Sequence, residues 1–292
     1  MKARGLADRI VARLPEMTPQ VALGARYIVD HPDSMVVSSM REIAGRVGVA
    51  PATLLRLARM LGYEDWSGFR DVYVEHFRSS SPHYAEKADA LSKRQGVPRL
   101  VEEVLRAQTT ALQHAAATNP ADTIDAAAKL LSRAPRIFVA AFMSCRAPGL
   151  AFTYICRLFR SNVTLLGNEG TSLVADLADL RAEDAVLSIN FLPYASDIRL
   201  VADAVGRSRA TLICLADSRV TPLSEHAKSI LLFGAESPSF FPSITAAVSL
   251  VETLAAAMLA HAGDQAVQRV RAVEKALYAS GSYDSPGRGG VG

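Results

Sequence analysis

The residues best suited to chemistry in the first third of the chain are arginines grouped around a helical break. Residues 41–62 contain four arginines and a single acid, Glu42, which gives this stretch a net charge of +3. Guanidinium groups pair with phosphate oxygens, and a local excess of them is typical of a surface that contacts the nucleic-acid backbone. The formal charge of the whole 292-residue chain is also only +3. Any contact with nucleic acid therefore depends on this patch and not on a polycationic protein.

The spacing of small and apolar residues in the same stretch predicts two helices joined by a tight turn. Ser39 and Glu42 form a capping box, at which a short helix begins, and Gly48 ends that helix. Ala44 lies four residues before Gly48 and Leu54 six residues after it. This is the pattern of a helix-turn-helix, with a small residue at the helix crossing, a glycine in the turn and a large aliphatic residue on the second helix. An ordinary pair of core helices separated by a glycine is the alternative.

The second helix is expected to begin with a proline at its first position and to bury Leu54 and Leu57. The residues that then face outward or lie at the rim are candidates for contact with phosphates and base edges of double-stranded DNA. The predicted DNA-binding residues are Arg41, Arg46, Pro51, Thr53, Arg56 and Arg59. The alternative is that these arginines only solvate a helix face.

The second half of the chain alternates short apolar runs with helix-forming segments. The runs cover residues 137–139, 163–166, 185–189, 211–214 and 230–233. Apolar runs of this length between helices predict a five-stranded parallel sheet that is covered on both faces. The fold class is therefore an N-terminal all-α helix-turn-helix domain followed by an α/β domain. In such a domain a ligand is expected beyond the carboxyl ends of the strands.

Length and local breaks set the expected domain boundaries. Half of the 292 residues are hydrophobic, and this length suits about two domains. The chain is predicted to contain a helix-turn-helix domain over residues 1–78, a linker with a connecting helix over 79–124, the α/β domain over 125–265, and a C-terminal helix with a disordered tail over 266–292.

Several classes of protein are excluded by what the sequence lacks. The three cysteines are odd in number and have no CxxC spacing, which predicts reduced, buried thiols. The six histidines are scattered, so neither a metal site nor a cofactor is expected. Residues 1–18 lack the apolar core of a signal peptide. Residues 244–262 are apolar but contain Glu252 and His261, which favours a packed helix over a membrane span. A cytoplasmic protein with no membrane partner is expected.

Six stretches between residues 17 and 77 carry a family resemblance. They are Thr18–Pro19, Ile28–Pro32, Arg41–Val49, Ala52–Leu57, Leu61–Tyr63 and Trp66–Phe69. With these stretches the chain resembles the N-terminal domain of the RpiR family of bacterial transcription regulators. One departure is Ala50–Pro51, where such proteins usually carry a serine cap at the start of the recognition helix. A lost cap costs about 1 kcal/mol, which the proline partly offsets by fixing the first φ angle.

The same family joins its helix-turn-helix to a sugar-isomerase (SIS) domain, and residues 125–265 resemble one. The resemblance implies that loops after the first, third and fourth strands hold a phosphosugar with Ser, Thr and backbone amides. The effector-binding residues that it implies are Ser144, Ser188, Asn190, Asp217, Ser218, Thr221 and Ser243. The alternative is that Ser144 and Ser188 cap helices, that Asp217 and Ser218 order their own loop, and that Ser243 caps the last helix. Two loops depart from the family pattern. Ala140 and Phe142 replace the glycines of the GxGxS motif, and Pro193 and Tyr194 stand near the place of the SGxT cradle.

The resemblance implies a DNA-binding transcriptional regulator that is controlled by a phosphorylated or acidic carbohydrate derivative. Reading two half-sites requires two DNA-binding modules, so a homodimer or homotetramer is expected. The alternatives are a SIS-type sugar-phosphate isomerase and a non-catalytic sugar-binding scaffold. Isomerisation requires a placed acid or base, and Glu169, Asp217, Glu236 and His226 form no recognisable pair near the loops. The protein is therefore expected not to be an enzyme and to have no catalytic residues.

Overall fold

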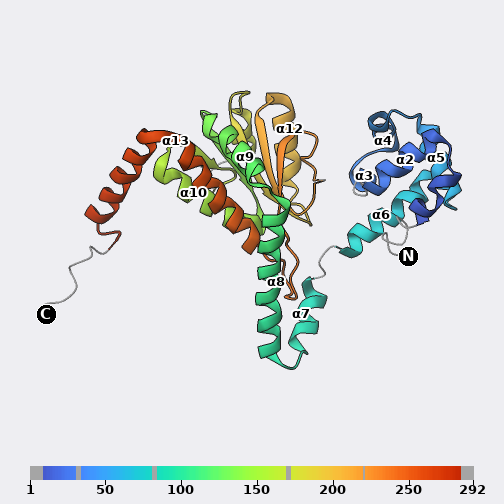
Figure 1. The fold of residues 1–292 in the computed structure, drawn as a ribbon, viewed down its shortest axis with the longest axis horizontal. Coiled ribbons are helices and arrows are strands. Elements are labelled where there is room, and N and C mark those ends of the chain that lie inside the picture. The colour runs from blue at the N-terminus through green and yellow to red at the C-terminus, as the bar shows by residue number, and fades with distance from the viewer. Residues whose placement is uncertain (1–8, 31–33, 81–83, 169–171, 220, 284–292) are drawn as a thin grey trace. The chain divides into compact units, whose positions relative to one another are not determined.

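The computed structural model describes residues 9–30, 34–80, 84–168, 172–219 and 221–283. The chain divides into two compact units, Met1–Lys87 and Ala88–Gly292 (Figure 1). This division falls within helix α7 (Tyr84–Ser92), nine residues beyond the boundary at residue 78 that the sequence suggested.

The N-terminal unit is all-helical. It consists of η1 (Leu14–Glu16), α2 (Pro19–Asp30), α3 (Ser34–Val37), α4 (Met40–Val47), α5 (Pro51–Met60) and α6 (Trp66–Ser80). Ile28, Ile43, Leu54, Leu57 and Phe69 are fully buried in its core. The apolar periodicity of each helix therefore faces one common interior, as the predicted helix-turn-helix requires.

The α2 and α5 helices approach each other closely. A Cβ atom at Gly24 of α2 would lie 2.7 Å from Cδ2 of Leu54. Leu54, which the sequence assigned to the crossing of α4 and α5, thus also packs against the backbone of α2. On α4, Ile43 and Ala44 are buried, while Met40 and Val47 are half-buried.

The C-terminal unit has a five-stranded parallel sheet, as predicted. Its strands are β1 (Ile137–Ala141), β2 (Val163–Leu165), β3 (Ala185–Asn190), β4 (Thr211–Ala216) and β5 (Ala227–Leu232), in the order β2-β1-β3-β4-β5. The chain leaves β1 toward β2 on one side and crosses to β3 on the other. The point between β1 and β3 is therefore the topological switch point, where doubly wound sheets bind ligands.

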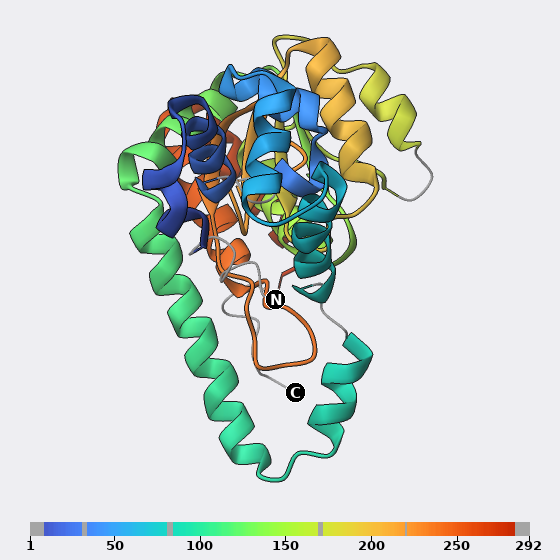
Figure 2. The same cartoon turned by 90° about the vertical axis from the view of Figure 1, so that its right-hand side faces the viewer.

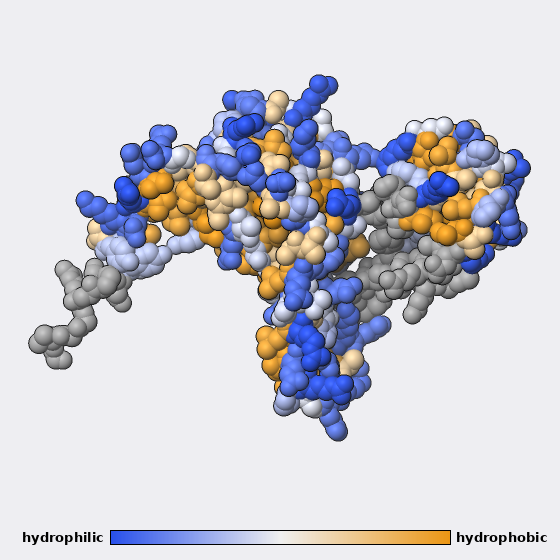
Figure 3. Space-filling model, viewed as in Figure 1, coloured by the Kyte–Doolittle hydropathy of each residue, from blue (hydrophilic) through white to orange (hydrophobic). Residues whose placement is uncertain are grey.

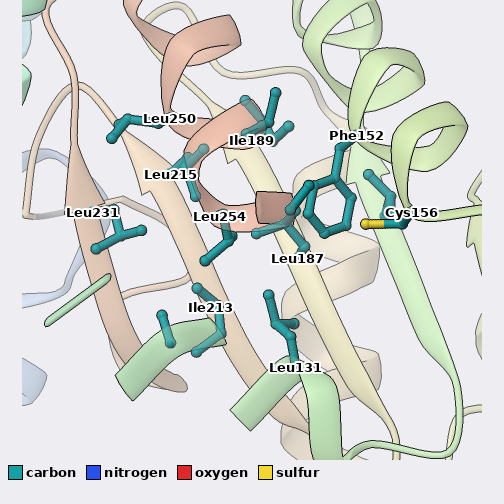
Figure 4. Packing of buried hydrophobic residues seen from close by; sticks show 14 of the residues in the cluster. Leu131, Phe152, Cys156, Leu187, Ile189, Ile213, Leu215, Leu231, Leu250 and Leu254 are labelled. Carbon is teal, nitrogen blue, oxygen red and sulfur yellow. The ribbon is translucent and has the colours of Figure 1, made fainter. Parts of the chain in front are cut away.

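Helices cover both faces of this sheet. One face packs against α9 (Ala121–Arg133), α10 (Arg146–Phe159), α13 (Thr245–Ala279) and the end of α8 (Val97–Thr118). The other face packs against α11 (Leu173–Ala178) and α12 (Asp197–Ser208). Figure 4 shows Phe152 and Cys156 of α10 beside strand residues of the first face. Burial on both faces explains why the central strands β1, β3 and β4 are buried almost throughout and mostly apolar.

The α10 helix lies unusually close to β1. A Cβ atom at Gly149 would lie 2.5 Å from the Cβ atom of Ala141. The short helical turn η2 (Met143–Cys145) joins this strand to α10. The contact between Gly149 and Ala141 therefore sets the position of the loop that carries Ser144.

The α13 helix is the one described helix that is long and apolar enough to cross a membrane by length and composition. Its first half instead supplies Leu250, Val251, Leu254 and Met258 to the core, as the predicted packed helix over residues 244–262 requires. Gly263, at φ 71° and ψ −171°, breaks the helix. Residues 280–283 of the predicted disordered tail form a turn after α13, and the rest of that tail lies outside the described residues.

Candidate functional sites

The turn between α4 and α5 has the geometry of a helix-turn-helix. Ser39 caps α4, with the Ser39 amide donating to Glu42 Oε2 at 2.6 Å and the Glu42 amide donating to Ser39 Oγ at 3.3 Å. The predicted capping box is thus confirmed. Gly48 ends α4 at φ 75°, in the left-handed region that favours glycine, and the Val49 amide donates to the Ala44 carbonyl at 3.0 Å. This glycine redirects the chain into α5.

The start of α5 lacks a side-chain cap. Ala50 occupies the N-cap position and accepts no side-chain hydrogen bond there, and Pro51 follows at the first helical position. This agrees with the sequence, in which a serine cap is missing. The amides of the first turn point away from the helix body and carry the positive end of its dipole. Pro51 has no N–H and the Thr53 amide donates to the Ala50 carbonyl at 2.9 Å, so the Ala52 amide is available to an anion such as a DNA phosphate.

The six predicted DNA-binding residues lie on α4 and α5. Arg41, Arg46, Pro51, Arg56 and Arg59 are exposed, and Thr53 is half-buried. Leu54, Leu57 and Ala58 form the buried side of α5. The helix is therefore amphipathic, with its arginines away from the core.

The arginines differ in whether they form hydrogen bonds within the protein. Arg46 Nη1 donates to Ser38 Oγ at 3.0 Å, and Arg59 Nε donates to the Glu64 carbonyl at 3.4 Å. Among the described residues, Arg41 and Arg56 have no hydrogen-bond or ion-pair partner. These two guanidinium groups lie beside the turn and are available for contacts with another molecule.

Sequence reasoning missed two arginines that brace the far end of α5. Arg9 Nη2 donates to the Leu61 carbonyl at 2.8 Å, and Arg13 Nη1 donates to the Met60 carbonyl. Cations at a helix C-terminus stabilise the negative end of its dipole. No local pattern signals such a contact, because the partners are about 50 residues apart in the chain.

In the C-terminal unit, Ser188 and Asn190 lie at the carboxyl end of β3. Both are buried, and Asn190 Nδ2 donates to Ser188 Oγ at 3.0 Å. Asn190 Oδ1 is buried and has no partner. Alternation along the strand places these two side chains on the same side as Val186, which belongs to the face that α11 and α12 cover.

Asp217 follows β4 directly. Its Oδ2 accepts a hydrogen bond from the Leu192 amide at 3.2 Å, while its Oδ1 is buried without a partner. Burial raises the pKa of this carboxyl group, opposed by backbone hydrogen bonds from Leu192 and Asp217. No cationic side chain contributes to that balance. A buried acceptor without a donor costs free energy, and such groups are typically paired with water or a ligand.

Cys145 links this carboxyl group to the loop after β1. Burial, followed by the negative charge of Asp217, raises the pKa of the Cys145 thiol to about 12, against a hydrogen bond from the backbone of Phe191. The loops after β1, β3 and β4 therefore meet around Cys145 and Asp217. Ser144, the preceding residue, is half-buried.

The remaining predicted effector residues are engaged in turns or lie beside them. Thr221 Oγ1 accepts from the Leu223 amide at 3.0 Å. Ser243 Oγ accepts from the Thr245 amide at 3.3 Å and donates to Thr245 Oγ1 at 3.1 Å. Ser218 is half-buried. The structure thus brings Ser144, Asn190 and Asp217 to one edge of the sheet, whereas Thr221 and Ser243 order their own loops.

The loop after β1 contains one strained residue, directly after the position of the second missing glycine. Met143 has φ 53°, in the left-handed region, and is highly exposed. Phe142 is half-buried and packs against the core on the α12 side. Across the described ranges, no group of three or more His, Cys, Asp or Glu residues is arranged to hold a metal ion.

The chain is similar in sequence to one known domain family and to two known proteins. Residues 130–257 match the family model of the SIS domain. An uncharacterised HTH-type transcriptional regulator of Caldanaerobacter subterraneus is 21% identical over 225 residues, which is 76% of this chain and 78% of that protein. An uncharacterised HTH-type transcriptional regulator of Providencia stuartii is 22% identical over 193 residues, covering 65% of this chain and 67% of that protein.

Two solved structures share the fold. The sugar isomerase domain of an RpiR transcription factor from Sphaerobacter thermophilus matches 61% of this chain and 99% of its own, with a TM-score of 0.57 and 20% identity. The NanR protein of Vibrio vulnificus, solved in complex with ManNAc-6P, matches 94% of this chain and 98% of its own, with a TM-score of 0.55 and 16% identity. The C-terminal unit therefore has the SIS fold, and the predicted resemblance to regulators of this type is confirmed.

Proposed function

We propose that this protein is a DNA-binding transcriptional regulator whose SIS-fold unit binds a sugar phosphate or a related carbohydrate derivative. The observation that carries the proposal is the uncommitted Arg56 on the exposed side of α5, opposite the buried Leu54 and Leu57. This helix follows a glycine turn of helix-turn-helix geometry in a chain that also contains a SIS fold. The similarity to proteins named as HTH-type transcriptional regulators supports the same assignment.

In the proposed complex, α5 enters the major groove of the operator. Arg56 and Thr53 reach base edges or phosphates, and Arg41 contacts the phosphate backbone from α4. The exposed start of α5 at Pro51 brings the Ala52 amide to a phosphate. Arg46 and Arg59, whose guanidinium groups also bind within the protein, supply peripheral phosphate contacts.

The proposed effector site lies at the carboxyl edge of the sheet, near the switch point. Ser144, Ser188, Asn190, Asp217, Ser218, Thr221 and Ser243 are its proposed residues. The unpaired oxygens of Asn190 and Asp217 support it, because each accepts a hydrogen bond that a ligand hydroxyl or amine supplies. A solved relative of similar fold is described in complex with ManNAc-6P, which suggests a phosphorylated sugar derivative here as well.

We propose a non-enzymatic, cytoplasmic role and a homo-oligomeric state. Two helix-turn-helix units on one duplex require at least a dimer. The isomerase alternative requires a general base near the sugar carbon. Asp217 is the buried carboxylate at this edge, and no histidine or second carboxylate affects its pKa. Absence of turnover with any bound sugar phosphate would support the regulator over the isomerase.

The DNA-binding half of the proposal is tested with duplexes selected by the full-length protein from a randomised library. Arg56→Ala should weaken binding to the selected operator by about 5- to 150-fold, which corresponds to about 1–3 kcal/mol for one base-contacting side chain. Arg207→Ala, on the exposed surface of α12, removes the same charge from the other unit and serves as a control. Equal operator affinity of Arg56→Ala and Arg207→Ala, with both proteins folded, would refute the assignment of α5.

The effector half is tested by thermal shift against sugar phosphates, amino-sugar phosphates and sugar acids. A ligand at 100 times its dissociation constant stabilises the protein by about 2.7 kcal/mol. Asp217→Asn keeps the shape of the side chain and removes its charge, so it should reduce the shift caused by any true ligand of this edge. A ligand shift of the same size in Asp217→Asn and wild type would place the ligand elsewhere.

A further inference from the structure

The α10 helix begins at the carboxyl edge of the sheet with an arginine and contains no acid. Its two charged residues are Arg146, at its first position, and Arg157, in its last turn. A cation in the last turn lies at the negative end of the helix dipole, whereas a cation in the first turn lies at the positive end. The dipole therefore favours the position of Arg157 and opposes that of Arg146.

Neutral acceptors in the loop after β2 hold the Arg146 side chain. Its Nη2 donates to Asn168 Oδ1 at 2.6 Å, and its Nη1 donates to the Leu166 carbonyl at 3.4 Å. Asp176 of α11 accepts from the Gly167 amide at 3.4 Å and forms no ion pair with Arg146. Within the described ranges no carboxylate pairs with this guanidinium group. It has five N–H donors, so most of them remain for another molecule.

The guanidinium group is accessible, and the exposed surface that follows it on α10 is apolar. Arg146 is half-buried, while Leu150 and Tyr154 are 58% and 55% exposed. Figure 3 shows apolar side chains gathered over α10 and the neighbouring α13. An anion that approaches the start of α10 therefore meets Arg146 as the cation of this helix.

Arg146 and the buried Asn190 follow neighbouring strands. Ala141, the last residue of β1, pairs with Ile189 of β3, and Asn190 is the next residue of that strand. Asn190 is 3% exposed, and in the described part of the chain its Oδ1 has no hydrogen-bond partner. A buried acceptor of this kind is typically paired with water or with a donor of a ligand. The edge at the switch point thus offers an acceptor to a ligand hydroxyl and a cation to an anionic group.

Phe142 packs against the same loop to which Arg146 is bonded. A Cβ atom at Gly167 would lie 3.6 Å from Cε1 of Phe142. The next helix along the chain, α11, lies beside α12 on the face of the sheet that Phe142 helps to cover (Figure 2). A loop with a large side chain here brings fewer backbone amides close to an anion than a glycine loop does. A long cationic side chain is then the group that reaches an anion at this edge.

We infer that Arg146 binds the anionic group, a phosphate or a carboxylate, of the ligand at the carboxyl edge of the sheet. The inference rests on the proposed effector site and names the residue that recognises charge there. A guanidinium group forms two parallel hydrogen bonds to either anion. The bound anion also lies near the positive end of α10, where it offsets the unfavourable position of the cation.

Phenylglyoxal, which modifies arginine side chains, tests the inference residue by residue in the full-length protein. Modification is quantified by mass spectrometry at increasing concentrations of inorganic phosphate and constant ionic strength. Phosphate at about four times its dissociation constant should slow the modification of Arg146 about 5-fold. Arg157 and the exposed Arg219, in the loop after β4, should react at unchanged rates. Protection of Arg219 instead, or protection confined to Arg41 and Arg56 of the N-terminal unit, would overturn the inference.

Substitution separates a ligand contact from a structural role. Arg146→Gln keeps a donor for Asn168 and removes the charge, so it should weaken phosphate binding at least 10-fold. Binding is followed by the slowing of thiol modification, because all three cysteines lie in the C-terminal unit. Arg146→Lys keeps the charge without the paired donors and should retain part of the affinity. Arg157→Gln is the matched control on the same helix and should bind phosphate as the wild type does.

The stability of the proteins without phosphate provides an independent result. Arg146→Gln removes a cation from the positive end of α10, so its thermal midpoint should equal or exceed that of the wild type. A residue that only ties the loop after β2 to the helix would show the opposite effect. A lowered midpoint together with unchanged phosphate affinity in Arg146→Gln would assign Arg146 a structural role and overturn the inference.

Acetate in place of phosphate distinguishes the two sources of negative charge. Protection of Arg146 by phosphate alone supports a phosphorylated ligand, and stronger protection by acetate supports a sugar acid. Protection by neither anion would contradict the inference.

These outcomes are separable from those of the proposed function. A carbohydrate derivative that stabilises the wild type and Arg146→Gln equally would retain the effector site and remove Arg146 from it. Protection of Arg146 by phosphate in a protein that no carbohydrate derivative stabilises would remove the proposed effector and leave anion binding at Arg146 intact.

Discussion

The contact between Gly149 and Ala141 predicts that an added methyl group will destabilise the C-terminal unit. In Gly149→Ala the new Cβ lies 2.5 Å from Ala141 Cβ and 3.3 Å from Leu165 Cδ1. Carbon atoms in good contact are about 3.5–4.0 Å apart, so α10 must move by about 1 Å from β1. Ala141 cannot rotate away because its Cβ is fixed to the backbone of a central strand.

The size of this effect follows from two opposing contributions. Overpacking of a core costs about 1–3 kcal/mol, and the rigid contact here places Gly149→Ala near the upper limit. Replacement of glycine by alanine inside a helix returns about 1 kcal/mol. The free energy of unfolding should therefore fall by about 2 kcal/mol, and the melting temperature of a domain of this size by about 4–8 °C.

The distribution of reporter residues allows the two units to be followed separately. The single tryptophan, Trp66, lies in the N-terminal unit, and all three cysteines lie buried in the C-terminal unit. The rate at which Ellman's reagent modifies the thiols reports opening of the C-terminal unit, and Trp66 fluorescence reports unfolding of the other. Gly149→Ala should accelerate thiol modification about 30-fold where modification follows the opening equilibrium, and leave the Trp66 transition unchanged.

Gly206→Ala is the matched control on α12. Its new Cβ meets the ring of His226 at 3.1 Å, and that ring is exposed and free to move. The stability of Gly206→Ala should lie within about 1 kcal/mol of wild type, since the helix propensity gain opposes a small contact cost. Equal stability of Gly149→Ala and Gly206→Ala would exclude the predicted overpacking against Ala141.

Three further predictions concern the same unit. Asp184 is fully buried, and hydrogen bonds from Arg136 and the Arg181 amide outweigh the effect of burial and lower its pKa. The ionised Asp184 stabilises the folded protein fully above the pKa of about 4 that it has in the unfolded chain. This stabilisation is lost as pH falls through the lowered pKa of the folded protein. Asp184→Asn should therefore flatten the pH dependence of the urea midpoint below about pH 4. Met143 has a left-handed backbone conformation, which glycine adopts without strain. Met143→Gly should therefore raise the free energy of unfolding of the C-terminal unit by about 1 kcal/mol in the thiol assay. A destabilised variant would argue against strain at this turn. Burial raises the pKa of Cys214 to about 12, so wild-type stability should decline above the unfolded thiol pKa of about 8.5, and Cys214→Ala should reduce that decline in urea titrations at pH 8 and 10.

The features that sequence reasoning anticipated are those set by local spacing. The capping box at Ser39, the left-handed Gly48 and the buried Leu54 follow from positions within 16 residues of one another. The central strands were equally readable, because burial on both faces makes each one a continuous apolar run. Such patterns need no knowledge of what lies across the fold.

The features that sequence reasoning missed depend on contacts between residues far apart in the chain, or belong to an edge strand that pairs on one side alone. Strand β5 begins at Ala227, three residues before its apolar run, because this edge strand pairs with β4 alone and its first residues are partly exposed. The bond from Arg9 to the Leu61 carbonyl joins residues 52 apart. The pair formed by Arg136 and Asp184 spans 48 residues and has no local signature. The role of Thr221 in its own turn also required the backbone geometry.

The carboxyl edge of the sheet also suggests how this site differs from a phosphate cradle. A cradle built on glycines offers backbone amides, which donate hydrogen bonds to an anion. Here the loop after β1 carries Phe142 and Met143, while one oxygen each of Asn190 and Asp217 is buried without a partner. Such oxygens accept hydrogen bonds from a hydroxyl or an amine. These groups therefore support the proposal that this edge recognises donor groups of a ligand at Asn190 and Asp217.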